Sequence, residues 1–140
     1  MDAAENKRIL QQVFAGLAEG DPRPLVQALA EDFCWVITGN TKWSRRYEGK
    51  QTVLDELFAR LRERIVGRIK TRAHRFIAED DSVVVLARGD NLTVAGKRYD
   101  NDYCYVCRLR DGKLIELIEY FDTELVREAL GDPAVPLAAG

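Results

Sequence analysis

Two stretches decide the fold of this chain: SVVVLARGD at residues 82–90 and KRYDNDYCYVCRLRDGKLIELIEYFDTEL at residues 97–125. In both, apolar side chains recur at every second position, which is the period of a β-strand with one covered face. Together with the residues before them they predict four strands, at 68–78, 83–94, 98–110 and 113–122. The connections at 79–81, 95–97 and 111–112 consist of turn formers and are too short for a crossover, so successive strands must pair antiparallel.

Several charged side chains stand among the apolar residues of these strands, and we single out Arg88, Asp90, Glu119 and Asp122. A charged group that points into the covered face of a sheet loses its hydration and needs a partner. Proteins rarely keep several such groups together without using them, so this part of the chain is expected to carry a functional site.

The N-terminal half is predicted to be mainly helical. Apolar residues recur at spacings of three and four over 6–19 and over 51–65, and a shorter helix is expected at Leu25, Val26 and Leu29. A strand at 33–38 and a polar loop at 39–49 precede the last of these helices, and a short helix at 123–130 follows the last strand.

These elements predict a single α+β domain over residues 1–130. In it, a curved antiparallel sheet wraps around the N-terminal helices and forms a cone-shaped α+β barrel. The interior of such a cone is apolar and is a natural place for a small molecule to bind. Residues 131–140 are expected to form a flexible C-terminal tail.

Composition argues against several classes of function. The 21 Lys and Arg residues nearly balance the 23 Asp and Glu residues, and the net charge of -2 argues against nucleic acid as a partner. No apolar run approaches the ~20 residues of a membrane span, and the charged N-terminus has no signal-peptide core. The three cysteines are expected to be reduced thiols of a cytoplasmic protein, and Cys104 and Cys107 would point to opposite faces of one strand. We therefore expect no metal site and no cofactor.

The order of the elements, with AEDFCWVITG at 30–39, YEGKQTVLDELF at 47–58 and DNDYCYVCRLRDGKLIELIEYFDT at 100–123, resembles the SnoaL-like branch of the nuclear-transport-factor and ketosteroid-isomerase superfamily. The resemblance covers about residues 6–130. It implies a cone-shaped barrel, commonly a homodimer formed through the outer face of the sheet. It implies no single reaction, because this scaffold carries cyclases, isomerases, hydrolases, dehydratases and binding modules.

Arg88 and Asp90 share one face of a predicted strand, and together with Asp122 they resemble the catalytic set of limonene epoxide hydrolases. In that family one carboxylate activates water, the other protonates the epoxide oxygen, and the arginine holds both. The resemblance is incomplete: Asn40 has a counterpart in that family, but Thr38 stands where a tyrosine is expected. The alternative is that Arg88 and Asp90 form an ordinary ion pair near a strand end.

Asp122 is the preferred proton-transfer group. SnoaL-like cyclases use a carboxylate as acid and base in an intramolecular aldol closure, and the segment EYFDT places Asp122 at that position. The competing interpretation is that Asp122 caps the helix that follows. Glu119 would face the other side of a regular strand, so it ranks behind Asp122. Ketosteroid isomerases carry their base near Ile37 or Thr38, and neither residue can accept a proton from carbon at neutral pH.

Aromatic and polar side chains are predicted to bind the substrate. Aromatic rings with a hydroxyl group at their edge often hold large apolar ligands, and the single histidine titrates near neutral pH. The expected binding residues are Trp35, Asn40, Trp43, His74, Asn101, Tyr103, Tyr105 and Glu119.

Two classes of function remain open. The first is an enzyme that uses carboxylate acid/base chemistry on a hydrophobic, polyketide- or terpenoid-like small molecule, by cyclisation, isomerisation or epoxide hydration. Asp122, Asp90 and Arg88 would then be its catalytic residues. The second is a non-catalytic ligand-binding or dimerisation module of the same fold.

Overall fold

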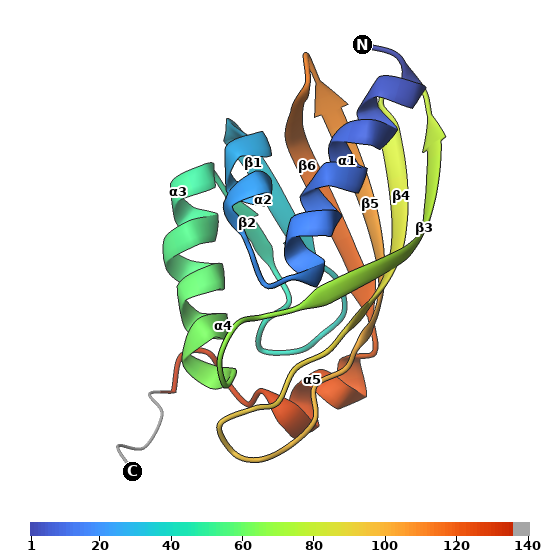
Figure 1. The fold of residues 1–140 in the computed structure, drawn as a ribbon. Coiled ribbons are helices and arrows are strands. Elements are labelled where there is room, and N and C mark those ends of the chain that lie inside the picture. Colours follow the sequence, from blue (N-terminus) through green and yellow to red (C-terminus); the bar gives the residue numbers. More distant parts are fainter. Residues whose placement is uncertain (136–140) are drawn as a thin grey trace.

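A six-stranded curved sheet forms the body of the molecule, and helices lie against one of its faces (Figure 1). The computed structural model describes residues 1–135. The strands follow the order β2-β1-β6-β5-β4-β3 across the sheet, which confirms the predicted α+β class. The elements are α1 (Ala3–Ala18), α2 (Arg23–Ala28), β1 (Leu29–Ile37), β2 (Arg46–Glu48), α3 (Lys50–Thr52), η1 (Val53–Phe58), α4 (Ala59–Arg64), β3 (Thr71–Glu79), β4 (Ser82–Gly89), β5 (Asp102–Arg110), β6 (Lys113–Phe121) and α5 (Thr123–Ala129).

The predicted antiparallel meander is present, but the complete sheet is mixed. β3, β4, β5 and β6 pair antiparallel in chain order. β1 instead lies parallel to β6, with Ile37 opposite Glu119, and β2 adds an antiparallel edge strand within the predicted loop 39–49. The parallel pair joins segments from opposite ends of the chain, so the short connections between neighbouring strands could not reveal it.

Residues 90–101, which were predicted to extend two strands, form an irregular loop in which only an isolated antiparallel bridge between Leu92 and Arg98 continues the pairing. β4 ends at Gly89 and β5 begins at Asp102. The side chain of Asn91 accepts from the N–H of Lys70 at 2.9 Å and donates to its carbonyl oxygen at 3.1 Å. These contacts satisfy backbone groups that a strand ladder would otherwise pair. Both predicted strands are therefore too long at this end.

The first helix buries one face against the sheet, as its periodicity predicts. α1 begins with a capping box, in which the side chains of Asp2 and Glu5 accept from each other's backbone N–H groups. Its buried residues include Leu10, Val13 and Phe14, and the helix packs against β3 and β4. The helical segment over residues 50–64 lies at the other side of the sheet, beside β1 and β2 (Figure 1).

The predicted helix 51–65 is present as one uninterrupted helical segment, in which α3, η1 and α4 follow one another. The turns of η1 are π-helical. Turns of this type occur mostly as local widenings of α-helices and often lie beside functional sites. Here they carry Leu57 and Phe58, which both line a cavity between the helices and the sheet.

The first residues of the predicted flexible tail are held in place. The buried side chain of Arg64 donates to the carbonyl oxygen atoms of Leu130, Asp132 and Val135 at 3.1, 2.8 and 2.8 Å. The indole N–H of Trp43 donates to the carbonyl oxygen of Gly131 at 2.8 Å. Buried donors thus bind the backbone of the first part of the predicted tail, residues 131–135, to the domain. Residues 136–140 of that prediction lie outside the described residues.

Candidate active site

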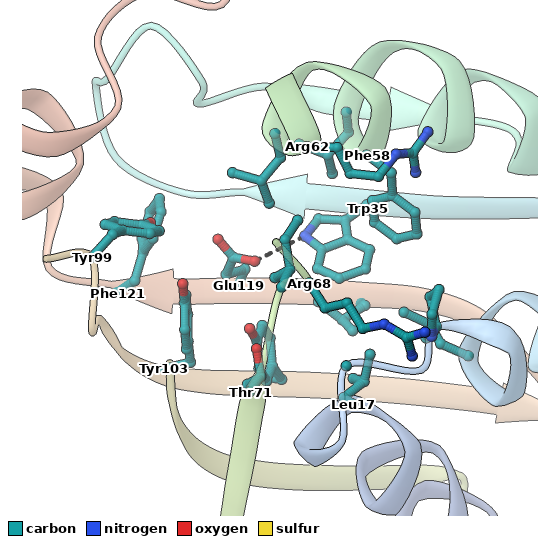
Figure 2. A pocket seen from close by; sticks show the side chains of 18 of the residues that line it. Leu17, Trp35, Phe58, Arg62, Arg68, Thr71, Tyr99, Tyr103, Glu119 and Phe121 are labelled. Carbon is teal, nitrogen blue, oxygen red and sulfur yellow. Dashed lines mark hydrogen bonds between the residues drawn. The ribbon is translucent and has the colours of Figure 1, made fainter. Parts of the chain in front are cut away.

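A cavity of about 610 Å³ opens between the sheet, α1 and the helical segment over residues 50–64 (Figure 2). Cavities of this size bind small organic molecules. Much of the wall is aromatic, and these rings belong to Phe14, Trp35, Trp43, Phe58, Tyr99, Tyr103, Tyr105 and Phe121. The apolar interior that the sequence predicts is therefore present.

Glu119 is a carboxylic acid buried in the wall of this cavity. The residue is only 7% exposed, and the indole N–H of Trp35 donates to its Oε1 at 3.2 Å (Figure 2). Within residues 1–135 the other carboxylate oxygen, Oε2, has no hydrogen-bond partner. Every side-chain oxygen or nitrogen atom that is fully buried in this part of the chain does have a partner, so Oε2 is not fully buried and faces the open cavity. Burial penalises the charged form and raises the pKa of Glu119 from 4.5 to about 8, although the hydrogen bond from Trp35 lowers it.

The alternation of side chains along β6 explains why Glu119 points inward. Leu117, Glu119 and Phe121 are spaced by two residues, and all three line the cavity. The carbonyl oxygen of Glu119 accepts from the N–H and the hydroxyl group of Thr38, at 3.2 and 2.8 Å, so the end of β1 fixes this position. Ile37, near which ketosteroid isomerases would carry their base, lies directly opposite Glu119. The acid thus enters the cavity from the neighbouring strand.

Two tyrosines near Glu119 bring phenol groups into the cavity (Figure 2). Tyr99 is buried, and its hydroxyl oxygen accepts from the amide of Asn101 at 3.4 Å. The ring of Tyr103 stacks on that of Tyr105 at a centroid distance of 5.0 Å. Burial raises the pKa of both Tyr99 and Tyr103, and the nearby Glu119 carboxylate raises it further. Both phenols stay protonated at neutral pH and can donate a hydrogen bond to an oxygen atom in the cavity.

Two of the predicted catalytic residues, Arg88 and Asp90, lie outside the cavity, so the expectation that they meet Asp122 inside it is wrong. Arg88 is exposed and pairs with Asp102 of β5 at 3.3 Å. Asp90 is exposed and pairs with Arg98 at 2.7 Å. β4 ends at Gly89, one residue before Asp90, and both side chains are exposed rather than turned into the cavity. Each forms a surface ion pair, but not with the other.

Asp122 is the N-cap of α5 rather than a group in the cavity. Its exposed side chain accepts from the N–H groups of Glu124 and Leu125 at 3.0 and 3.3 Å. The interpretation of Asp122 as a helix cap is therefore confirmed. The acid inside the cavity is Glu119, which the sequence placed second.

The predicted substrate-binding residues divide into two groups. Those that line the cavity are Trp35, Trp43, Tyr103, Tyr105 and Glu119. Asn40 is exposed in a loop, where its carbonyl oxygen accepts from Arg127. His74 is exposed where a register shift interrupts the pairing of β3 with β4. Asn101 is buried, but its amide pairs with the N–H and carbonyl groups of Asp122 at 2.9 and 3.0 Å, which holds the ends of β5 and β6 together.

The predicted binding residues do not include four aromatic residues of the cavity wall: Phe14, Phe58, Tyr99 and Phe121. The position of Phe121, two residues after Glu119, was the available signal that both share the inner face of a strand. Tyr99 belongs to the loop before β5, and Phe58 ends the π-helical segment. The helix period places Phe58 on the apolar face of the predicted helix, but a period alone does not show that a cavity lies beside that face.

Two kinds of feature are not found in the described part of the chain. No group of three His, Cys, Asp or Glu side chains is arranged to hold a metal ion. No helix there has both the length and the apolar character needed to cross a membrane.

This chain belongs to the SnoaL-like domain family, whose profile matches residues 10–117. The match confirms the resemblance to the nuclear-transport-factor and ketosteroid-isomerase superfamily, and NTF2-like proteins share the fold. A search of curated proteins finds no match.

Three solved structures with this fold share 20 to 22% sequence identity with this chain. A protein from Jannaschia sp. CCS1, proposed to be a SnoaL-like polyketide cyclase, is 21% identical, with 96% of this chain and 95% of that chain covered and a TM-score of 0.75. TerC, co-crystallised with polyporic acid, is 22% identical, with coverages of 90% and 98% and a TM-score of 0.76. An LEH-like epoxide hydrolase from M. tuberculosis is 20% identical, with coverages of 91% and 90% and a TM-score of 0.71. At these identities the likeness establishes the fold alone.

Proposed function

We propose that this protein is a cofactor-independent enzyme that transfers protons on a hydrophobic small molecule, with Glu119 as its acid and base. The observation that carries the proposal is one carboxyl group buried in an apolar cavity, with one oxygen held by Trp35 and the other facing the cavity. A pKa of about 8 lets this group change its charge close to neutral pH, where a general acid or base works best. The relative TerC, crystallised with polyporic acid, supports a small organic molecule as the ligand.

The proposed reaction begins at a carbon next to a carbonyl group. The carboxylate of Glu119 takes a proton from this carbon, the electron pair of the C–H bond forms a C=C bond to the carbonyl carbon, and the π electron pair of the carbonyl group moves to its oxygen. The hydroxyl groups of Tyr99 and Tyr103 stabilise the resulting enolate by hydrogen bonds. If the substrate has a C=C bond between the β- and γ-carbons, the enolate is a dienolate, and Glu119 returns the proton to the γ-carbon while the double bond moves between the α- and β-carbons, which completes an isomerisation. Alternatively, the enolate carbon attacks a second carbonyl group and Glu119 protonates the new alkoxide, which completes a cyclisation.

The protonation state of Glu119 sets the pH range of this chemistry. With a pKa of about 8, roughly one tenth of the molecules carry the carboxylate at pH 7. Removal of a proton from carbon should therefore become faster as the pH rises to about 8 and level off above it. A step that needs Glu119 as an acid should show the opposite dependence.

Epoxide hydration receives less support from the geometry. The set that resembles limonene epoxide hydrolases, Arg88, Asp90 and Asp122, is dispersed over surface ion pairs and a helix cap. Asp21, the other acid of the cavity wall, is bound by Arg23 through both carboxylate oxygen atoms. The alternative from another class is a non-catalytic binding module, which would use the same cavity without a proton transfer.

Deuterium exchange separates the enzyme from the binding module before the natural substrate is known. In D₂O the protein should accelerate exchange of the protons next to the carbonyl group of 1-tetralone, an apolar bicyclic ketone, as followed by ¹H NMR. Glu119→Gln should reduce this acceleration by at least ~100-fold, because it removes the base. Asp122→Asn, which removes a carboxylate outside the cavity, is the matched control and should exchange at the wild-type rate. An unchanged rate in Glu119→Gln would favour the binding module.

We also propose that two copies of the chain pair through the outer face of the sheet, as the family resemblance implies. Val36, Ile118, Val106, Val84 and Ile77 are successive partners across β1, β6, β5, β4 and β3. Because side chains alternate along each strand, this apolar row lies on the face opposite Glu119. A second copy would remove the row from water.

A further inference from the structure

Apart from Glu119, the charged residues that line the cavity in the described chain gather at its mouth. They are Asp21, Arg23, Arg62 and Arg68, and the three arginines are exposed. They come from α2 and the turn before it, from α4, and from the loop before β3. In Figure 2 the guanidinium groups of Arg62 and Arg68 lie on one side of Trp35, and the carboxyl group of Glu119 lies on the other.

The one acid at the mouth is already occupied. Arg23 binds both carboxylate oxygen atoms of Asp21, through Nε and Nη2 at 2.9 Å each, and these bonds lower the pKa of Asp21 to about 2. Arg68 acts on Asp21 through its charge, without a hydrogen bond. Over residues 1–135, Arg62 and Arg68 form no ion pair and no side-chain hydrogen bond. Two guanidinium groups therefore remain open at the entrance, each with N–H donors spaced to match a carboxylate.

The local backbone makes room for Arg68 at the entrance. Gly20 has a φ of +74°, and a Cβ atom there would come within 2.7 Å of the Cβ of Arg68. The stem of Arg68 thus packs directly on the glycine, a position that no residue with a side chain could share without a shift. β3 begins at Thr71, so Arg68 lies before the strand, in the loop that borders the cavity.

We propose that the substrate is an amphiphilic acid, a hydrophobic body with a carboxylate at one end, which Arg62 and Arg68 bind at the mouth. The assignment rests on the proposed function, because it places the reacting carbon of the same molecule beside Glu119. The apolar wall takes up the body of the molecule, and the open guanidinium groups pair with its charge. Over residues 1–135 the positively charged side chains that line the cavity all lie at its mouth. A substrate that entered with its carboxylate end first would therefore place this charge near Glu119 without a positively charged partner. The substrate therefore enters in one orientation.

Two dyes that share an apolar body test this assignment. 8-Anilinonaphthalene-1-sulfonate carries an anionic group and N-phenyl-1-naphthylamine does not, and both fluoresce in an apolar cavity. The double variant Arg62→Gln/Arg68→Gln should bind the anionic dye about tenfold more weakly, roughly threefold for each arginine, and the neutral dye equally well. Arg60→Gln is the matched control, since it removes an exposed arginine of the same helix that pairs with Glu63.

Two further measurements narrow the ligand. A rise from about 50 to about 500 mM NaCl should weaken binding of the anionic dye and spare the neutral one. Dodecanoate should displace either dye from the wild-type protein at lower concentration than dodecan-1-ol, and the double variant should lose this difference. The competition also establishes that both dyes occupy the same cavity.

Equal effects on the two dyes would overturn the assignment, because the arginines would then act by packing or not at all. So would equal displacement by the acid and the alcohol. These results are independent of the deuterium-exchange test. If the protein accelerates deuterium exchange but shows no preference for the anionic dye, the proposed substrate class is wrong and the proposed proton transfer stands. If it prefers the anionic dye but does not accelerate exchange, the proposed proton transfer is wrong and the anionic ligand class stands.

Discussion

Glu119 combines two requirements that oppose each other. An apolar environment favours the uncharged carboxyl group, whereas abstraction of a proton from carbon needs the carboxylate. The hydrogen bond from Trp35 favours the carboxylate and offsets part of the effect of burial. The result is a residue that can hold either state near neutral pH, with one oxygen oriented by Trp35 and the other open to a ligand.

This residue should also make the stability of the fold depend on pH. In the unfolded chain Glu119 ionises near pH 4.5, whereas in the folded protein it keeps its proton up to about pH 8. Its raised pKa contributes stability that is fully present below pH 4.5 and is lost as the pH rises through about 8, by up to about 5 kcal/mol. The free energy of unfolding of Glu119→Gln should therefore exceed that of the wild type by several kcal/mol at about pH 9 and equal it at about pH 4, as measured by urea unfolding.

Comparing the variant with the wild type isolates this residue. Other acids, such as Asp21 with its lowered pKa, titrate in both proteins and cancel in the difference. The buried indole rings of Trp35 and Trp43 report unfolding in both. A difference in free energy of unfolding that stayed constant across this pH range would contradict the burial of a titrating carboxyl group at position 119.

The short helix α5 begins at a side-chain cap. It has only seven residues, too few to be stable alone, and Asp122 satisfies two of its free N–H groups. The segment contributes Val126 to the cavity wall, and Leu130 follows it there. The cap therefore stabilises one end of the cavity without touching a ligand.

Two replacements of Asp122 should separate the effect of its hydrogen-bond acceptor on stability from the effect of its charge. Asp122→Ala removes the acceptor and should lower the free energy of unfolding by about 1 kcal/mol. Asp122→Asn keeps an acceptor and should change stability by only a few tenths of a kcal/mol. Thermal unfolding of the two variants at one pH checks this order, and equal losses in both would show that the charge, rather than the cap, is what matters.

At the scale of the whole molecule, the two faces of the sheet have different tasks. The inner face, together with the helices, encloses the cavity. The outer face presents the apolar row from Val36 to Ile77, and Ile77 is 45% exposed. The proposed dimer would cover this row and leave the mouth of the cavity, on the helical side, open to solvent.

A charge in the centre of the outer face should abolish the dimer. Val106 lies between Val84 and Ile118 in the row, and Val106→Lys would bury an ammonium group against a second copy. Light scattering should give twice the chain mass of 15.9 kDa for the wild type and a single chain mass for the variant. Gln12→Lys adds the same charge on the exposed side of α1 and should remain dimeric. A wild-type protein that is monomeric at micromolar concentration would contradict the proposal.

The sequence predicted the elements whose pattern is local. The helix over 6–19 and the strands from 68 to 122 were visible because one buried face repeats at a fixed spacing. The loop over 90–101 was not, since it depends on the side chain of Asn91, which pairs with the backbone of Lys70. The parallel contact of β1 with β6 was also hidden, because no nearby turn encodes it.

By itself, the sequence determined the α+β class, the superfamily and the presence of an apolar interior. The tertiary structure decided which acid enters that interior. Whether Glu119 or Asp122 faced the cavity depended on where β6 ends and which helix it meets, and α5 takes the carboxylate of Asp122 as its cap. The raised pKa of Glu119 depends on burial by distant segments and on Trp35 of β1. The spacing of apolar residues in the sequence predicts which face of a helix or strand is buried. It does not predict which segments bury that face, because those segments come from distant parts of the chain.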